Sequence, residues 1–315
     1  MIHVQGLTKT YRGRAVVDGI SFEAGRGEIV GFLGPNGAGK STTMRILAGF
    51  LLPTSGKAEI AGHDVVEQSL EARRHLGYMP EDVPLYPEMR VEEYLRYRAG
   101  IKGVTKALLK GSLDTNMERC GVADVRHKLI GTLSKGYRQR IGLADALIHD
   151  PAILILDEPT NGLDPNQIRS VREIIRSLGG NHTILLSTHI LAEVEAICER
   201  VIILDQGRIK ASGEPSKLAR RLERGARITV EVRGPAEAMA RILGAIDGVK
   251  KIAPESLGDD WTRFVMDIQG LADPREEIFR TVTREQWRLR HLSMEAATLE
   301  EIFAGLTTAP EEGWN

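Results

Sequence analysis

The sequence predicts an α/β fold followed by a second, smaller α+β domain at the carboxyl end. Residues 29–33 form an apolar run that leads through a glycine-rich turn into a helical pattern. Residues 152–156 form another continuous apolar run, which is typical of a strand buried on both faces of a parallel sheet. Helical and strand patterns then alternate as far as residue 204, and this alternation favours an α/β core.

Composition limits the class of protein. The chain has 315 residues, enough for two domains, a hydrophobic content of 42% and a formal net charge of -1, so nothing global points to nucleic acid. Cys120 and Cys198 stand in no metal-ligand spacing, which suits a reducing cytosol and predicts neither a disulfide framework nor a zinc site. No apolar run approaches the roughly 20 residues that span a bilayer, and no signal peptide is evident. Any membrane role is therefore expected to come through a partner.

The amino-terminal two thirds of the chain can be divided by periodicity. Short strands are predicted first, then a helical subdomain between about residues 87 and 150, then the alternating βα segments. The predicted strands are 2–7, 16–22, 29–33, 58–60, 152–156, 183–187 and 201–204, and residues 76–80 are predicted to be a short extended piece. The predicted helices are 67–76, 91–99, 106–120, 137–149, 165–178 and 190–199.

A domain boundary is predicted near residues 213–227, which gives domains at 1–220 and 221–315. The second domain has predicted strands at 228–232, 249–252, 261–268 and 287–292, with helices at 236–246 and 275–283. This β-α-β-β-α-β order is ferredoxin-like, and residues 299–306 are predicted to form a closing helix. From residue 221 onward there are 13 Lys and Arg against 17 Asp and Glu, which argues against a DNA-binding appendage.

The glycine-rich turn has the spacing of a phosphate-binding loop, Gly34-x-x-x-x-Gly39-Lys40-Ser41. Glycines let the backbone curl and point N–H groups inward, and the following helix adds the positive end of its dipole. Lys40 is expected to reach the β- and γ-phosphates, and the Ser41 hydroxyl to ligate Mg²⁺. A flexible turn with a chance lysine is disfavoured by the strand-to-helix context. The predicted nucleotide-binding residues here are Gly34, Pro35, Asn36, Gly37, Ala38, Gly39, Lys40, Ser41 and Thr42.

Two carboxylates, Asp157 and Glu158, end the buried run at 152–156. A nucleotide site needs a carboxylate at the carboxyl end of a neighbouring strand to hold the Mg²⁺ shell, and Asp157 fits. Glu158 is then placed to polarise a water for attack on the γ-phosphate. The alternative, a buried strand that ends in a solvated acidic turn, is disfavoured because the phosphate-binding loop is also present.

The sequence resembles the ATP-binding cassette ATPases. The motifs of that family occur in the family's order across residues 1 to about 215. Residues 133–140 look like the signature, usually Leu-Ser-Gly-Gly-Gln, and residues 161–164 look like the D-loop. Residues 187–189 match the switch histidine, and residues 76–81 match a segment that normally ends in glutamine. Tyr11 stands where the family places an aromatic ring under adenine.

The resemblance implies roles for these residues. His189 becomes a γ-phosphate sensor, and Asp164 belongs to the D-loop. The signature residues Ser134, Lys135 and Gly136 would contact the γ-phosphate bound to the opposite subunit, although Ser134 can also be the N-cap of the following helix.

The chain departs from the family pattern at two places. Glu81 replaces the usual glutamine; it can ligate Mg²⁺ through oxygen or act as a second acidic group. Lys135 and Tyr137 replace glycine and glutamine in the signature. Lys135 suits a phosphate, whereas Tyr137 loses an amide contact and could weaken a closed dimer.

The resemblance also implies partners. Two chains, or this chain and a paralogue, would sandwich two ATP molecules with Mg²⁺, closing on ATP binding and opening on hydrolysis. A separate transmembrane permease would dock on the segment 81–91, in a groove with Leu85, Tyr86 and Met89, unless that loop folds onto its own core. The chain would thus be the ATPase subunit of an exporter, cytoplasmic and peripheral on the inner face of the cell membrane.

Residues 221–315 resemble the regulatory or dimer-stabilising domains of such ATPases. Nothing in the sequence selects a cargo or predicts a nucleic-acid partner. One alternative is a soluble cassette ATPase acting as a mechanical switch on a non-membrane partner, but such proteins usually carry two cassettes or a long coiled coil. A P-loop GTPase or kinase is the other, and it would not explain the signature or the switch histidine.

Overall fold

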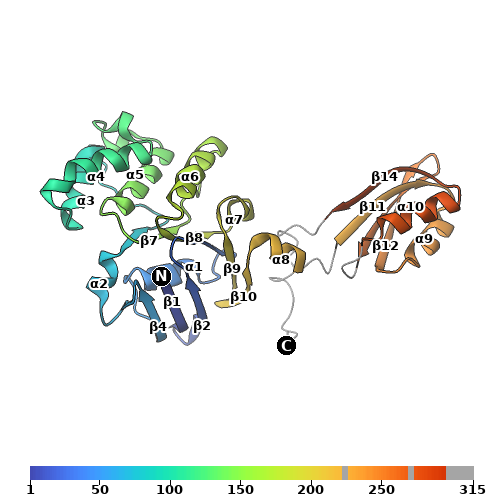
Figure 1. Ribbon diagram of the computed structural model, residues 1–315, viewed down its shortest axis with the longest axis horizontal. Coiled ribbons are helices and arrows are strands. Elements are labelled where there is room, and N and C mark those ends of the chain that lie inside the picture. The colour runs from blue at the N-terminus through green and yellow to red at the C-terminus, as the bar shows by residue number, and fades with distance from the viewer. Residues whose placement is uncertain (222–225, 269–272, 296–315) are drawn as a thin grey trace. The chain divides into compact units, whose positions relative to one another are not determined.

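The computed structural model describes residues 1–221, 226–268 and 273–295, and the chain divides into two compact units, Met1–Glu214 and Pro215–Asn315 (Figure 1). The predicted boundary at 220/221 lies at the end of helix α8 (Pro215–Arg221). The predicted closing helix at 299–306 lies outside the described residues.

An antiparallel sheet opens the first unit, in the order β2-β1-β4-β5. Its strands are β1 (Ile2–Tyr11), β2 (Arg14–Ala24), β4 (Ser55–Ile60) and β5 (His63–Asp64). Strands β1 and β2 are joined by Arg12 and Gly13, whose φ values of 49° and 82° suit a tight two-residue hairpin turn. Both strands extend beyond the predicted 2–7 and 16–22, because backbone pairing continues along polar residues that carry no apolar signal.

The central sheet has the order β10-β9-β3-β8-β7-β6, and only β10 runs antiparallel to its neighbour. Its strands are β3 (Ile29–Leu33), β6 (Leu76–Met79), β7 (Ile153–Asp157), β8 (Thr183–Thr188), β9 (Arg200–Asp205) and β10 (Arg208–Gly213). All residues of β3, β7 and β8 are buried, which confirms the prediction of a parallel sheet with both faces covered. Strand β10 was missed by periodicity because it is a half-exposed edge strand without an apolar run.

Helices follow the parallel strands and place their loops at one edge of the sheet. They are α1 (Lys40–Leu47) after β3, α6 (Pro165–Leu178) after β7 and α7 (Leu191–Ile197) after β8. Helix α2 (Ser69–Arg74) instead follows β5 and precedes β6. Because β3, β7 and β8 run in parallel, the glycine-rich turn, Asp157–Glu158 and His189 all lie at the carboxyl ends of these strands. Ligands of open α/β sheets bind at this edge.

Three helices lie between β6 and β7 and pack against one another. They are α3 (Val91–Ile101), α4 (Lys106–Arg119) and α5 (Lys135–Leu147), with 3₁₀ turns at Ala123–Val125 and Ile130–Thr132 (Figure 1). Helix α5 begins two residues before the predicted start at 137, because Ser134 caps it and accepts a hydrogen bond from Tyr137 N at 3.4 Å.

The second unit contains a four-stranded antiparallel sheet in the order β12-β13-β11-β14. Its elements are β11 (Ala226–Arg233), α9 (Ala236–Gly244), β12 (Val249–Gly258), β13 (Trp261–Ile268), α10 (Arg275–Arg284) and β14 (Arg288–Glu295). Its hydrophobic core includes the buried residues Ile228, Val230 and Phe264. Strand β12 runs past the predicted end at 252 into a hairpin turn at Asp259 and Asp260, with φ values of 50° and 61°.

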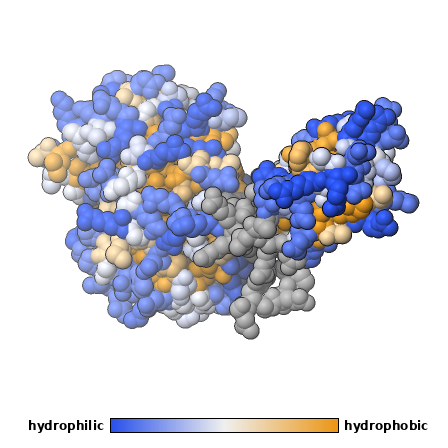
Figure 2. All heavy atoms as spheres, turned by 45° about the vertical axis from the view of Figure 1, so that its right-hand side comes forward, coloured by the Kyte–Doolittle hydropathy of each residue, from blue (hydrophilic) through white to orange (hydrophobic). Residues whose placement is uncertain are grey.

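Hydrophilic residues cover most of the face shown in Figure 2, with smaller hydrophobic areas between them. Among the helices of the described ranges, none has both the length and the apolar character that a bilayer crossing requires. Cys120 and Cys198 are free and buried, and burial raises the pKa of both thiols to about 12.

Candidate functional site

The turn after β3 curls so closely that only glycine fits at two positions. A Cβ added at Gly34 would lie 2.4 Å from Leu204 O, and one at Gly39 would lie 2.6 Å from Val16 O. Gly39 also has a φ of 104°, which side chains rarely adopt. The turn therefore holds a cradle of backbone that leads directly into the N-terminus of α1.

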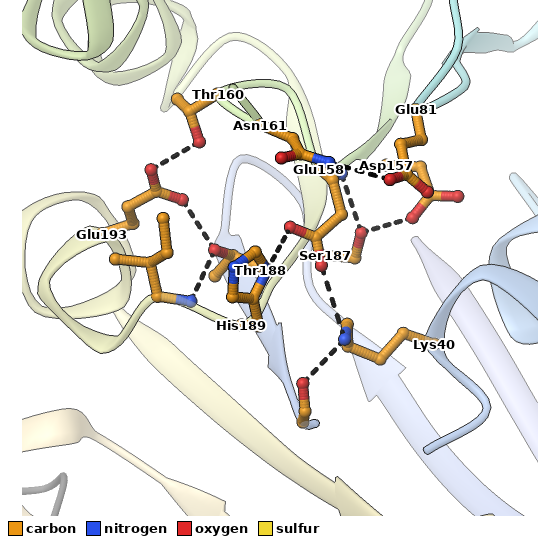
Figure 3. Close-up of polar contacts among 12 residues, drawn as sticks. Lys40, Glu81, Asp157, Glu158, Thr160, Asn161, Ser187, Thr188, His189 and Glu193 are labelled. Carbon is orange, nitrogen blue, oxygen red and sulfur yellow. Dashed lines mark hydrogen bonds and ion pairs between the residues drawn. The ribbon is translucent and has the colours of Figure 1, made fainter. Parts of the chain in front are cut away.

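Lys40, the first residue of α1, is only 5% exposed. Its Nζ donates to Gly34 O at 2.7 Å and to Pro35 O at 3.2 Å, and it lies 3.4 Å from Glu158 Oε1 (Figure 3). A buried ammonium must be compensated by hydrogen bonds and opposite charge, and these contacts do so. Oxygen atoms of a phosphate can take the places of the two carbonyl oxygens.

Asp157 ends β7 and is 1% exposed. Its Oδ1 accepts from Ser41 Oγ at 3.1 Å and from Ser187 Oγ at 2.5 Å. Burial raises the pKa of this carboxyl above its usual value, while the two serine hydrogen bonds oppose the shift. Ser41, Asp157 and nearby Glu81 offer only oxygen donors, which is the ligand set that Mg²⁺ prefers.

Glu158 occupies a left-handed backbone conformation with a φ of 49°, uncommon for a residue other than glycine. Its backbone N donates to Ser187 Oγ at 3.0 Å, and its Oε2 lies 2.8 Å from His189 Nδ1. The side chain is thereby turned between Lys40 and His189 (Figure 3). Strained residues of this kind cluster at functional sites.

Lys40, Glu158 and His189 line a cavity of about 430 Å³. Its lining residues are Val16, Asn36, Gly37, Gly39, Lys40, Ser41, Thr42, Glu81, Glu158, Asn161 and His189. Sequence reasoning did not assign Val16, which is one apolar strand residue among many, or Asn161, which it noted only as the start of the D-loop. The Asn161 amide donates to Glu81 Oε1 at 2.8 Å, so the residue in the place of the family's glutamine is tied to the loop after β7.

Several predicted residues do not line this cavity. Gly34, Pro35, Ala38 and Asp157 belong to the neighbouring segments but are not lining residues, and Tyr11, Ser134, Lys135, Gly136 and Asp164 do not line it either. Tyr11 is 46% exposed, with Lys9 Nζ 5.2 Å from its ring centroid. Asp164 is the N-cap of α6 and accepts from Asn166 N and Gln167 N, both at 3.0 Å. In a single chain, the side chains of Tyr11 and Asp164 therefore have local structural contacts.

The two unusual signature residues contact the chain's own loops. A Cβ added at Gly162 would lie 2.3 Å from Lys135 Nζ, so the lysine ammonium lies over the D-loop backbone. Tyr137 OH donates to Asp124 Oδ2 at 2.7 Å, and the Arg140 guanidinium lies 4.3 Å from the tyrosine ring centroid. Tyr137 is thus held by the helical subdomain.

The segment predicted to contact a membrane subunit, residues 81–91, lies between β6 and the start of α3. Leu85 and Met89 are partly buried, and Tyr86 is 43% exposed with its ring 5.9 Å from Tyr94 and 6.1 Å from Tyr97. A hollow of about 590 Å³ between α1, α2, β6 and α3 is lined by other residues, among them Phe50, Leu70, Arg73, Tyr78, Arg98, Ile101 and Lys102. These positions are scattered in sequence, so no local pattern pointed to them.

The fold and the first cavity define a nucleotide-binding protein with a P-loop. The family model described as "ABC transporter" matches residues 17–161, and a model of an AAA domain matches residues 129–195. The Nod factor export ATP-binding protein I of Ralstonia nicotianae is 34% identical over 98% of this chain and 94% of its own length. The bacitracin transport ATP-binding protein BcrA of Bacillus licheniformis is 41% identical over 66% of this chain and 68% of its own.

Solved structures agree with these relatives. An ATP-binding subunit of an ABC transporter has a TM-score of 0.64 and 33% identity over 70% of this chain and 92% of that chain. The chain therefore belongs to the ATP-binding subunits of ABC transporters, a family of ATPases.

Proposed function

We propose that this chain binds ATP with Mg²⁺ in the 430 Å³ cavity and that its ATPase cycle powers export through a separate transmembrane permease. The observation that carries the catalytic part is the contact of Glu158 with both Lys40 and His189 at the edge of the phosphate cradle. Transport is supported by the name of the bacitracin transport ATP-binding protein BcrA, and export by the name of the Nod factor export ATP-binding protein I.

In the proposed reaction, the backbone N–H groups of residues 36–42 and the N-terminus of α1 hold the phosphates. Lys40 turns from the carbonyls of Gly34 and Pro35 to the β- and γ-phosphate oxygens. Glu158 accepts a proton from the attacking water, and His189 contacts the γ-phosphate and fixes the Glu158 carboxyl. Ser41, Asp157 and Glu81 would hold Mg²⁺, which neutralises charge on the phosphate oxygens.

A second subunit, either an identical chain or a paralogue, completes the site in this proposal. Ser134, Lys135 and Gly136 do not line their own chain's cavity, yet they stand at the N-terminus of α5, where an anion is favoured. Two chains placed head to tail would bring each signature to the other chain's nucleotide, with Asp164 and the D-loop between them. Closure on ATP binding and opening after hydrolysis would drive the permease.

The experiment that tests this function is recovery of the full chain from membranes of its own host after mild detergent treatment, with mass spectrometry of what accompanies it. A polytopic membrane protein in stoichiometric yield is expected, with the ATPase peripheral on the inner face of the cell membrane. Recovery only with non-membrane proteins would reject the transporter and favour a soluble ATP-driven switch.

The hollow beside α3 is the proposed docking site of the permease, together with Leu85, Tyr86 and Met89. Phe50, Leu70 and Ile101 are 73%, 71% and 59% exposed, an apolar group that a short amphipathic helix could cover.

Phe50→Ala is expected to weaken assembly with the permease by about 10- to 100-fold, because burying an aromatic side chain contributes about 1.5–3 kcal/mol. Tyr86→Ala and Leu85→Ala should act in the same direction. Affinity purification at graded protein concentration measures the effect, and Leu108→Ala, which removes a leucine that is 66% exposed on α4, is the control. Unchanged assembly in all three variants would place the groove elsewhere.

The second unit is proposed to regulate or stabilise the dimer. The test compares a chain that ends at Arg220 with the full chain, both carrying Glu158→Gln. The shortened chain should dimerise about tenfold more weakly with ATP, because contacts between residues 221–315 of the two chains would be lost. Sedimentation over a concentration series measures this. Equal dimerisation would instead assign the unit to regulation by a cargo or partner.

A further inference from the structure

A buried carboxyl group joins the two loops that carry Glu158 and His189. Glu193 lies on α7 and is 1% exposed. Its Oε1 accepts a hydrogen bond from Thr160 Oγ1, and its Oε2 accepts one from Thr188 Oγ1 at 2.7 Å (Figure 3). Glu193 does not line the cavity of the proposed nucleotide site. It contacts Thr160 and Thr188 and not the space that a nucleotide would fill.

Each threonine is next to a site residue in the chain. Thr160 follows Glu158 by two residues and is 3% exposed, and Thr188 immediately precedes His189 and is fully buried. Thr188 Oγ1 also accepts from Ile190 N at 3.0 Å, so its hydroxyl fixes the backbone on the far side of His189. One carboxyl group therefore sets the spacing of the loop after β7 relative to the loop after β8.

That spacing matters because the contact between Glu158 and His189 bridges two strands. The 2.8 Å distance between Glu158 Oε2 and His189 Nδ1 has little tolerance, since a hydrogen bond is lost beyond about 3.5 Å. Glu158 also has a left-handed backbone conformation, which is strained and persists only where surrounding contacts enforce it. Glu193 supplies such contacts from outside both loops.

The same carboxyl group reaches the helix that follows the D-loop. The Nη2 atom of Arg172, on α6, lies 3.6 Å from Glu193 Oε1, so a positive charge faces the buried carboxyl. Helix α6 begins at Pro165, directly after its N-cap Asp164. Glu193 is thus the point at which the loop after β7, the loop after β8 and helix α6 meet.

We propose that Glu193 is a positioning residue for ATP hydrolysis, which holds the Glu158 and His189 loops at the separation that the reaction needs. The proposal rests on the roles proposed above for Glu158 and His189. Because the phosphate contacts come from residues 34–42, which Glu193 does not touch, its loss should affect turnover and leave nucleotide binding nearly unchanged.

The test compares Glu193→Gln, Thr188→Val and Thr160→Val in the full chain. A glutamine has one oxygen acceptor in place of two, so one threonine hydroxyl loses its partner, and each valine removes a hydroxyl at nearly constant shape. Each variant should lower kcat by about 10- to 100-fold, since a displacement of about 1 Å costs up to about 100-fold, while the Kd for Mg-ATP stays within about threefold. Glu195→Gln, the same change at an exposed position on α7, should keep wild-type kcat.

A second measurement separates positioning from a general effect on folding. In a His189→Ala background, Glu193→Gln should lower kcat by less than about twofold, because the contact that it supports is already absent. A kcat within about twofold of wild type in all three variants would overturn the proposal, and so would a full additional loss in the His189→Ala background. If Glu193→Gln fails to fold, the two valine variants give the same comparison.

The Glu158→Gln variant distinguishes a failure of the positioning role of Glu193 from a failure of the proposed function of the site. If that variant stalls turnover while the Glu193 and threonine variants do not, only the positioning role fails. If Glu158→Gln itself keeps wild-type turnover, the proposed function of the site fails first.

Discussion

Glu158→Gln is expected to lower kcat by about 10²- to 10⁴-fold, the range that a positioned general base contributes. The amide keeps the size of the side chain but cannot accept the proton of the attacking water. The phosphate contacts of residues 34–42 remain, so the Kd for Mg-ATP should stay within about threefold of wild type. Single-turnover hydrolysis of labelled ATP, together with equilibrium binding, measures both quantities.

The matched control for this variant is Glu81→Gln, which makes the same change in the same cavity. A glutamine at position 81 keeps an oxygen for Mg²⁺, so this variant should retain turnover within about tenfold of wild type. A large loss in Glu81→Gln with little loss in Glu158→Gln would exchange the two assignments and make Glu81 the base.

Lys40→Met is expected to weaken Mg-ATP binding by about 100-fold. The ammonium is buried at the mouth of the glycine-rich turn, and each hydrogen bond from a charged group contributes about 1.5–3 kcal/mol. Methionine retains the length and apolar volume of the side chain but donates nothing to a phosphate. Fluorescence titration with a nucleotide analogue, in the presence of Mg²⁺, gives the change in Kd.

Lys40→Met is also expected to lower the stability of the fold, and this loss is measured separately from the loss of nucleotide binding. Lys40 Nζ lies 3.4 Å from Glu158 Oε1, so Lys40→Met leaves the Glu158 carboxyl buried without this partner. We expect the single variant to unfold at lower denaturant concentration and the double variant Lys40→Met, Glu158→Gln to recover part of the loss. Nucleotide affinity within about threefold of wild type in Lys40→Met would contradict the assignment of the phosphate cradle.

Local sequence was sufficient to predict the elements that build the core and its main site. The apolar runs at 29–33 and 152–156 became β3 and β7 because a strand buried on both faces has to be continuously apolar. The spacing of Gly34 and Gly39 predicted a tight turn, because a side chain at either position would collide with neighbouring backbone. Edge elements such as β10 were missed, since a half-exposed edge has no apolar signal.

By itself, then, the sequence determined the family of this protein, the buried strands of its parallel sheet and the residues that follow them. Only the tertiary structure decided how those residues meet. It placed Asp157 against Ser41 and Ser187, tied Asn161 to Glu81, and joined Thr160 and Thr188 through Glu193. Periodicity reports which face of an element is buried, whereas a polar contact between distant loops depends on the register of the sheet that carries them.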